Sequence, residues 1–392
     1  MTDPIADRTA VYVERAQQLA PLVHAHAEQG ERTAQLPAAV AEAFHQAGFF
    51  RMFLPVEMGG GDLTVPATLR VIEEVARLDG SAGWNLAICS GGPLFGHFIA
   101  REAYGEIFSD PRAVVAGSLN PTTTRVVSCP GGWRFSGKAS YVSGSAQASW
   151  LMAAGLVLDD GSPQLVDGVP VLRAGLFPIR HCTILDTWAV SGMRGTGSND
   201  CVFDDVVVPD GFTFRWPEPG ECWKQGPFAS IPLTVQLGVG LSTVALGVTR
   251  HAIDALIEIA AAKVPVGSRS PLRERPLAQM QLAEAEGWLR AARAYLFDSS
   301  DEVWRVGEAG AAFDHQVRAA ARLASVTAVK LCIRAVDLVQ EAAGMTAVQT
   351  SCPIERCWRD VHTLSQHVIL ATTRYEVVGR ILLGLDPGSP II

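Results

Sequence analysis

A histidine-containing stretch near the end of the chain, RCWRDVHTLSQHVIL from Arg356 to Leu370, carries side chains suited to acid–base chemistry. An imidazole exchanges its proton near neutral pH, so His362 and His367 are candidate general bases or metal ligands. In a regular helix, with about 100° between residues, Asp360 and Thr363 share a face with His367, and His362 lies about 140° away. The two histidines then cannot bind one metal ion, and no metal is predicted. From spacing alone, His367 is either a catalytic group oriented by Thr363 or a buried core residue, and His362 is interpreted as structural.

Three regions that differ in their pattern of apolar residues must position this stretch. Residues 1–110 show apolar residues three and four apart, which predicts an N-terminal helical domain interrupted by the glycine loop PVEMGGGDL. Residues 111–215 hold short runs rich in β-branched and aromatic residues, which predicts a middle β-domain of antiparallel strands. Residues 216–392 hold four long amphipathic segments, the last from Ile354 to Gly384, which predicts a C-terminal four-helix bundle. The predicted fold class is α+β.

The composition argues against several classes of function. Of 392 residues, 48% are hydrophobic and 18% charged, which indicates large cores, and a net charge of −8 without a basic block argues against a nucleic-acid partner. The chain contains no run of about 18 apolar residues, so no membrane span is predicted. The acidic start lacks the features of a signal peptide, so a cytoplasmic protein is expected. The eight cysteines have neither disulfide-framework nor zinc-site spacing and are expected to be reduced thiols.

Three motifs carry a resemblance to a known family. FRMFLPVEMGGGDL forms a turn in the N-terminal region, SGMRGTGSNDCVFDDVVVP closes the β-domain, and CPIERCWRD lies at the start of the last long segment. In this order, and spread over almost the whole chain, they resemble the acyl-CoA dehydrogenase superfamily, which has an N-terminal helical domain, a middle β-domain and a four-helix bundle. In the last motif, Glu355 and Arg359 stand four residues apart and can pair along a helix.

The resemblance implies a flavin bound between the β-domain and the bundle. YVSGSAQASW matches the segment that lies against the isoalloxazine ring, with Ser143 facing flavin N5, and AGSLNPTT matches a second segment along the ring. LVQEAAGM matches the bundle segment at the nucleotide end, which a neighbouring subunit often supplies. In the loop GSRSPLRERPLAQMQ, Arg269 or its competitor Arg273 would bind phosphate. The implied cofactor-binding residues are Ser118, Asn120, Ser143, Trp188, Arg269, Gln340 and Gly344.

Four of these residues also have a plain structural interpretation, which the sequence leaves open. Ser143 could serve turn chemistry, and Gly344 could be a helix C-cap. Arg269 could be a solvated loop residue, and Trp188 either a core residue or a wall of the flavin pocket.

The chemistry within the family depends on a carboxylate. Acyl-CoA dehydrogenases place a catalytic glutamate nine residues after the arginine that Arg359 matches, or on the first bundle helix. Here the first position is Val368, next to His367, and IPLTVQLGVGLSTVALGV contains no acid. No acidic residue lies between Asp360 and Glu376. The pattern W-R-D-x-H-x-x-x-x-H instead resembles aromatic hydroxylases among the two-component flavin-dependent monooxygenases of this fold, whose last histidine faces flavin C4a.

This branch implies reduced FAD or FMN from a separate flavin reductase, with molecular oxygen as cosubstrate. His367 and Ser143 are the predicted catalytic residues: His367 would deprotonate a phenol or bond the peroxide of a C4a-hydroperoxyflavin, and Ser143 would hold N5–H. The predicted substrate is an electron-rich aromatic compound, indole first and phenol next, in a pocket lined by Trp84, Phe95 and Phe98.

The alternatives are an acyl-CoA dehydrogenase with a relocated base, an amine N-hydroxylase and a non-catalytic scaffold. Because the flavin site of this fold borrows residues from a second subunit, a homotetramer is predicted, with a homodimer as the fallback.

Overall fold

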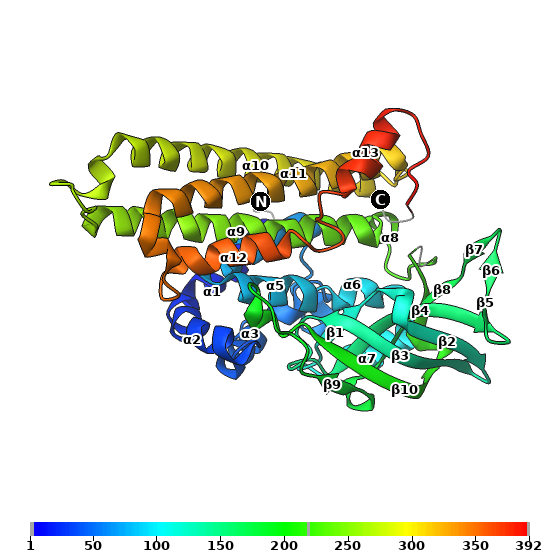
Figure 1. Ribbon diagram of the computed structural model, residues 1–392. Coiled ribbons are helices and arrows are strands. Elements are labelled where there is room, and N and C mark those ends of the chain that lie inside the picture. Colours follow the sequence, from blue (N-terminus) through cyan, green and yellow to red (C-terminus); the bar gives the residue numbers. More distant parts are fainter. Residues whose placement is uncertain (1–3, 218–219, 390–392) are drawn as a thin grey trace.

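The computed structural model describes residues 4–217 and 220–389. Helices of the N-terminal part lie between a β-sheet and a layer of long helices from the C-terminal part (Figure 1). The sequence order of helices, strands and long helices agrees with the predicted fold class. All eight cysteines are unpaired. Among the described residues, no helix is long and apolar enough to cross a membrane.

The N-terminal part is helical where apolar residues recur at helical spacing and polar residues cap the ends. Thr64 caps α4 by accepting the Ala67 N–H at 3.3 Å. Asp79 ends α4 and caps α5, because its Oδ1 accepts the Ala82 N–H at 2.9 Å. The helices are α1 (Pro4–Gln18), α2 (Ala20–Thr33), α3 (Ala38–Gln46), α4 (Val65–Leu78), α5 (Gly80–Cys89), α6 (Gly92–Gly96) and α7 (Arg101–Phe108).

The middle part is a nine-stranded sheet with the strand order β11-β8-β4-β2-β3-β10-β9, in which β1 and β5 also pair with β4. The prediction of antiparallel strands holds for most pairs, but β1 and β2 both pair with β4 in parallel. Alternation and turn residues identify strands, but pairing direction depends on connections that local pattern does not report. The strands are β1 (Val115–Ser118), β2 (Thr124–Cys129), β3 (Gly132–Val142), β4 (Trp150–Asp159), β5 (Ser162–Pro163), β8 (Leu172–Pro178), β9 (Thr183–Leu185), β10 (Asn199–Pro209) and β11 (Thr213–Trp216), with a separate hairpin of β6 (Leu165–Val166) and β7 (Val169–Pro170).

The C-terminal part is built around α9, which contacts α4 and α5 as well as the other bundle helices. A Cβ at Gly247 would lie 2.4 Å from the Glu73 carbonyl oxygen, so a glycine is needed where α9 crosses α4. The elements are α8 (Pro227–Ser230), α9 (Leu233–Ala262), α10 (Pro276–Glu308), α11 (His315–Ala343), α12 (Pro353–Leu364) and α13 (Arg374–Leu382), with the short helix η8 (Gly344–Val348) before α12.

The prediction of one helix from Ile354 to Gly384 was wrong. α12 ends at Leu364, and residues 365–373 form a series of turns before α13. The Ser365 hydroxyl bonds the His362 carbonyl at 2.6 Å, and the His367 N–H bonds the Leu364 carbonyl, three residues back, at 3.1 Å. These turns still bury Ile369 and Leu370, so the apolar spacing resembles that of a continuing helix. His367 therefore lies beyond α12.

Candidate active site

Three residues from the three parts of the fold meet at one point. Ser143 follows β3, Trp84 lies on α5, and His367 lies in the turns after α12. The Trp84 indole N–H donates to Ser143 Oγ at 3.0 Å. The Trp84 ring also meets the His367 ring edge to face, with 5.5 Å between the centroids. The structure thus brings together both predicted catalytic residues and one predicted pocket residue.

A chain of hydroxyl groups determines what Ser143 can bind. Thr196 Oγ1 donates to the Met193 carbonyl at 2.8 Å, and a carbonyl can only accept. Since the Thr196 proton is used there, Ser198 must donate to Thr196, and Ser143 must donate to Ser198, each across 2.7 Å. The Ser143 oxygen also accepts the Trp84 N–H and keeps one lone pair. Ser143 therefore fits one more donor, which is what bonding to a flavin N5–H requires.

Backbone and amide contacts hold the segments of this chain together. Gly144 N–H donates to the Thr196 carbonyl at 2.9 Å, and Ser145 Oγ donates to the Gly197 carbonyl at 3.0 Å. On α5, Asn85 Nδ2 donates to the Gly195 carbonyl at 3.1 Å and Asn85 Oδ1 accepts from Gln147 at 2.8 Å. These contacts place the turn after β3, the Met193–Ser198 turn and α5 against one another.

The turns after α12 hold His367 as a neutral hydrogen-bond donor. Nδ1 of His367 accepts the Ile369 N–H at 3.3 Å, so in the neutral ring the proton lies on Nε2. Burial, followed by repulsion from Arg322, lowers the pKa of His367 to about 4. The sequence-based suggestion that Thr363 orients the ring was wrong, because it assumed that α12 continues to His367.

Arg322 supports the same turns from the neighbouring helix α11. Its guanidinium donates to the Ile369 and Thr234 carbonyls, at 3.2 Å each, and it is 2% exposed. Among the described residues it has no carboxylate partner, and burial lowers its pKa to about 10, which leaves it charged at neutral pH. A buried cation without a partner is costly, so its position beside the His367 segment indicates a role there.

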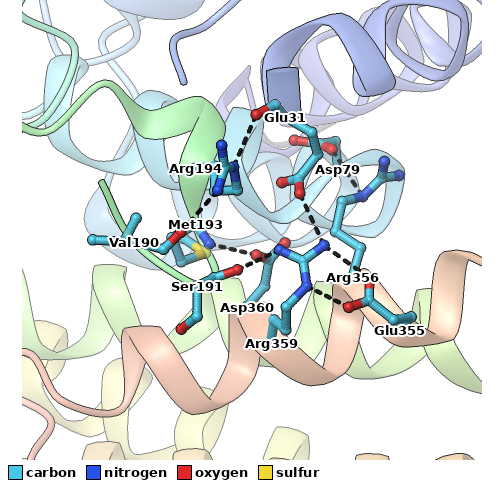
Figure 2. A network of polar contacts seen from close by, with 10 residues as sticks. All are labelled: Glu31, Asp79, Val190, Ser191, Met193, Arg194, Glu355, Arg356, Arg359 and Asp360. Carbon is cyan, nitrogen blue, oxygen red and sulfur yellow. Dashed lines mark hydrogen bonds and ion pairs between the residues drawn. The ribbon is translucent and has the colours of Figure 1, made fainter. Parts of the chain in front are cut away.

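The SGMRGT and PIERCWRD motifs meet in a polar network, which Figure 2 shows. Arg359 donates to Glu31 at 2.8 Å, to Glu355 at 2.6 Å and to the Ser191 carbonyl, so the predicted Glu355–Arg359 pair is confirmed. A Cβ at Gly192 would lie 2.3 Å from the Arg359 carbonyl oxygen, so a glycine is needed where the turn meets α12.

Asp360 joins the same turn to α12. Its Oδ1 accepts the Met193 N–H at 2.5 Å, and Met193 in turn carries the carbonyl that ends the hydroxyl chain. Burial, and then repulsion from Asp79, raises the pKa of Asp360 to about 7. Arg356, which lies 3.6 Å from Asp79, opposes this rise. The motif carboxylate therefore positions the Ser143 segment through Met193.

Three of the predicted flavin-ring contacts lie at different places around the sheet. Ser118 ends β1 and is half-buried. Asn120 is exposed, and its Oδ1 accepts from the N–H and hydroxyl of Thr122, which is local turn chemistry. Trp188 is half-buried, and its Nε1 donates to the Met193 carbonyl at 3.0 Å. Trp188 is thus tied to the turn that orders Ser143.

The predicted nucleotide-end residues lie at the other end of the bundle. Arg269 and its competitor Arg273 are exposed between α9 and α10. Gln340 lies near the end of α11, and Gly344 caps that helix at φ +56° by donating to the Gln340 and Glu341 carbonyls. The His367 segment lies near the start of α9, so a 30-residue helix puts the two sets about 40 Å apart. Within one chain, these residues and Ser143 do not form a single site.

The cavity that one predicted pocket residue lines is not lined by Trp84, Ser143 or His367. Phe95 lines it, together with residues of α4, α5, α6 and α9. Phe98 is half-buried and packs against Phe214 of β11, with 6.4 Å between the centroids. His362 bonds Asp337 of α11 at 3.0 Å and packs on Trp358, away from Trp84 and Ser143.

Sequence reasoning missed Thr196, Ser198, Arg322 and Gln236, the last of which lines the cavity. Thr196 and Ser198 belong to the motif SGMRGTGSND, and their hydroxyl groups are the signal that could have identified them. Arg322 and Gln236 stand in helices of ordinary composition, and only their burial distinguishes them.

Comparison with protein families agrees with this geometry. Models of the acyl-CoA dehydrogenase N-terminal and C-terminal domains match residues 12–102 and 239–372. An indole-3-acetate monooxygenase of Pseudomonas putida is 32% identical over 360 residues, 91% of this chain and 90% of the relative. The chain therefore belongs to the acyl-CoA dehydrogenase family and, within it, to the flavin-dependent monooxygenases.

Two further relatives lie in the same branch. The oxygenase component of an FADH(2)-dependent resorcinol hydroxylase from Rhizobium sp. (strain MTP-10005) is 26% identical, covering 96% of this chain and 94% of its own. The solved structure of XiaF from Streptomyces sp., in complex with FADH2 and glycerol, has a TM-score of 0.91 and 25% identity, covering 99% of this chain and 98% of its own. The predicted fold class and the predicted enzyme class are confirmed.

Proposed function

We propose that this protein hydroxylates an electron-rich aromatic compound, using molecular oxygen and reduced FAD or FMN delivered by a separate flavin reductase. The observation that carries the proposal is the meeting of His367, Trp84 and Ser143 where the three parts of the fold join. The relatives support it: one acts on indole-3-acetate, and another is an FADH(2)-dependent oxygenase component acting on resorcinol. An indole-type substrate is favoured, with a phenol next.

The side chains fit a reduced flavin. Bound reduced flavin would supply oxygen activation, through a C4a-hydroperoxide. Ser143 would accept the N5–H of a bound reduced flavin with its remaining lone pair, while its own O–H donates to Ser198. Keeping the N5 proton in place, in a site closed by the buried Trp84 ring, slows the loss of oxygen as hydrogen peroxide.

His367 acts as a donor in this proposal. Its Nδ1 is bonded to Ile369 and its pKa lies near 4, so the ring is neutral at pH 7 and presents Nε2–H. Such a ring can hydrogen-bond an oxygen of the peroxide or of a phenol. A base with so low a pKa would remove a phenol proton poorly at neutral pH, which makes the donor role the better of the two predicted roles.

We infer that the active enzyme is an oligomer, with a homotetramer favoured. Arg269, Gln340 and Gly344 lie too far from Ser143 to complete a flavin site in one chain. Exposed apolar side chains lie on nearby segments at the ends of α9 and α11, which the Lys263–Ala343 hydrogen bond joins: Ile257, Val264, Val266, Met345 and Val348. A surface of this kind is typical of an interface between copies.

The test uses chemically reduced flavin without a reductase. The protein is mixed with reduced FAD or FMN under anaerobic conditions, and oxygen is then added. The proposal predicts a transient absorption of the hydroperoxide type and, with indole present, a hydroxylated product. Flavin that is reduced by an acyl-CoA and oxidises without this transient would instead indicate a dehydrogenase.

A further inference from the structure

Met193 joins α12 to the hydroxyl chain in a backbone conformation that favours glycine. Its φ of +56° and ψ of +29° lie in the left-handed region, although the residue carries a side chain. This region is unfavourable for any residue with a Cβ, and such a conformation persists only where the surrounding structure fixes it. Met193 therefore depends on the groups that hold its two peptide bonds.

Those groups come from two parts of the fold. From α12, Asp360 Oδ1 accepts the Met193 N–H at 2.5 Å (Figure 2). From the segment between β9 and β10, Trp188 Nε1 donates to the Met193 carbonyl at 3.0 Å, and the Thr196 hydroxyl donates to it at 2.8 Å. Met193 is 3% exposed and Asp360 is 1% exposed, so water does not replace a contact that is lost.

The Met193 carbonyl decides which way the hydroxyl chain donates. The contacts of Ser198 with Thr196 and with Ser143, 2.7 Å each, could be donated from either end. With the carbonyl in place, Thr196 donates to it and the chain runs from Ser143 to Met193. In the reverse direction, Ser143 would accept from both Ser198 and Trp84. Only its proton would then remain for a flavin N5–H, which is itself a donor.

We propose that Asp360 is a positioning residue for the reaction: by fixing Met193, it keeps one lone pair of Ser143 free for the N5–H of reduced flavin. The inference rests on the proposed oxygenase function and adds to it a residue that acts from a distance. The same helix also supports His367, whose N–H bonds the carbonyl of Leu364 at the end of α12. α12 therefore positions both predicted catalytic residues, one at its end and the other through Asp360.

The first step, from Asp360 to Met193, can be tested without flavin by amide hydrogen exchange and mass spectrometry. Asp360→Leu and Asp360→Ala remove the acceptor, so amides of residues 192–198 should exchange about tenfold faster than in the wild type. Asp360→Asn keeps an oxygen that can accept the Met193 N–H, so it should retain most of the protection. Circular dichroism melting identifies which variants are folded. Wild-type exchange in a folded Leu or Ala variant would overturn the proposal.

The second step, from Met193 to Ser143, is measured as the decay of the oxygenated intermediate after reduced flavin and oxygen are added. Asp360→Leu should speed this decay about two- to tenfold, and no more than Ser143→Ala does. Combined with Ser143→Ala, it should add nothing further, because it acts through Ser143. Arg359→Met is the matched control, since Arg359 lies on the same helix and bonds the Ser191 carbonyl of the same turn. Its decay rate should stay near that of the wild type.

Three kinetic results would overturn the role of Asp360: unchanged decay in its folded Leu or Ala variant, additive effects in the double variant, or decay in Asp360→Asn as fast as in Ser143→Ala. The Asn result decides the question even where the Leu and Ala variants do not fold. If Ser143→Ala alone speeds the decay, any of these results rejects Asp360 and leaves the oxygenase function intact. A wild type that forms no oxygenated intermediate would overturn the proposed function, and this inference with it.

Discussion

Arg322 and His367 bind opposite ends of the same residue: Arg322 donates to the Ile369 carbonyl, and His367 accepts the Ile369 N–H. The cation thereby positions the imidazole and also lowers its pKa by repulsion. Arg322→Gln should raise the pKa of His367 and lower hydroxylation, whereas Arg322→Lys should keep that pKa low. The measurement is the pH at which hydroxylation per folded molecule is half lost on the acid side. An unchanged acid limb in Arg322→Gln would mean that Arg322 only fills space.

The pH dependence of stability should report the desolvated imidazole. The pKa of His367 is about 4 in the folded protein, against roughly 6.5 in an unfolded chain. Between these values the unfolded chain binds the extra proton, so the stability that this group contributes is complete above pH 6.5 and declines toward pH 4. The glutamine of His367→Gln cannot titrate. As the pH is lowered from 7.5 to 5, the melting temperature of the wild type should therefore fall more than that of this variant. A difference in melting temperature between the two proteins that does not change with pH would contradict the burial of the His367 ring.

The direction of hydrogen-bond donation along the hydroxyl chain can be tested by substitutions at Ser143 and Ser198. Ser143→Ala should keep flavin binding but speed the decay of the oxygenated intermediate about two- to tenfold, because one hydrogen bond is lost. Ser198→Ala leaves the Ser143 proton without its acceptor, so an intermediate increase in peroxide release is expected. Ser145→Ala is the matched control, since Ser145 lies in the same turn but donates to the Gly197 carbonyl. Equal peroxide yields in all three variants would rule out this chain as the group that holds N5–H.

The network of Figure 2 should contribute stability that a surface ion pair does not. Arg359 is 17% exposed and bonds Glu31, Glu355 and Ser191, so Arg359→Met should lower the melting temperature by several degrees. Arg290→Met is the control, because Arg290 is 79% exposed and its pair with Glu286 is of the kind worth about 0.3–0.5 kcal/mol. Equal melting temperatures for the two variants would show that the network is not a structural junction.

Much of the fold could be predicted because it depends on repeated local signals. Apolar spacing identified α9, α10 and α11, and runs of β-branched residues identified the strands. The same reasoning failed after Leu364, where turns bury Ile369 and Leu370 at intervals that a helix would also give. Parallel pairing of β1 and β2 with β4 depends on distant chain segments, which spacing within a strand does not report.

The site was predictable where a motif carried it. Ser143 and His367 followed from the resemblance, and Trp84 from its place on a helix near the flavin. Arg322 and Gln236 could not be found in this way, because only the structure shows that each is buried with one side-chain polar atom that has no hydrogen-bond partner among the described residues. The direction of the hydrogen bonds from Ser143 to Met193 could not be predicted from the sequence either. It depends on the group at the end of the chain, the Met193 carbonyl, which can only accept.

The central claim, that His367 is catalytic, is tested most directly by comparing His367→Ala with His362→Ala. Both variants are assayed for hydroxylation of an aromatic substrate with reduced flavin and oxygen, per folded molecule. The claim predicts that His367→Ala still folds and binds reduced flavin but loses about 10²–10⁴-fold in hydroxylation. The His362→Ala variant should lose far less hydroxylation, because His362 bonds Asp337 of α11 and does not contact Trp84 or Ser143. Equal losses at both histidines, or near-normal hydroxylation with a lowered melting temperature in His367→Ala, would contradict it.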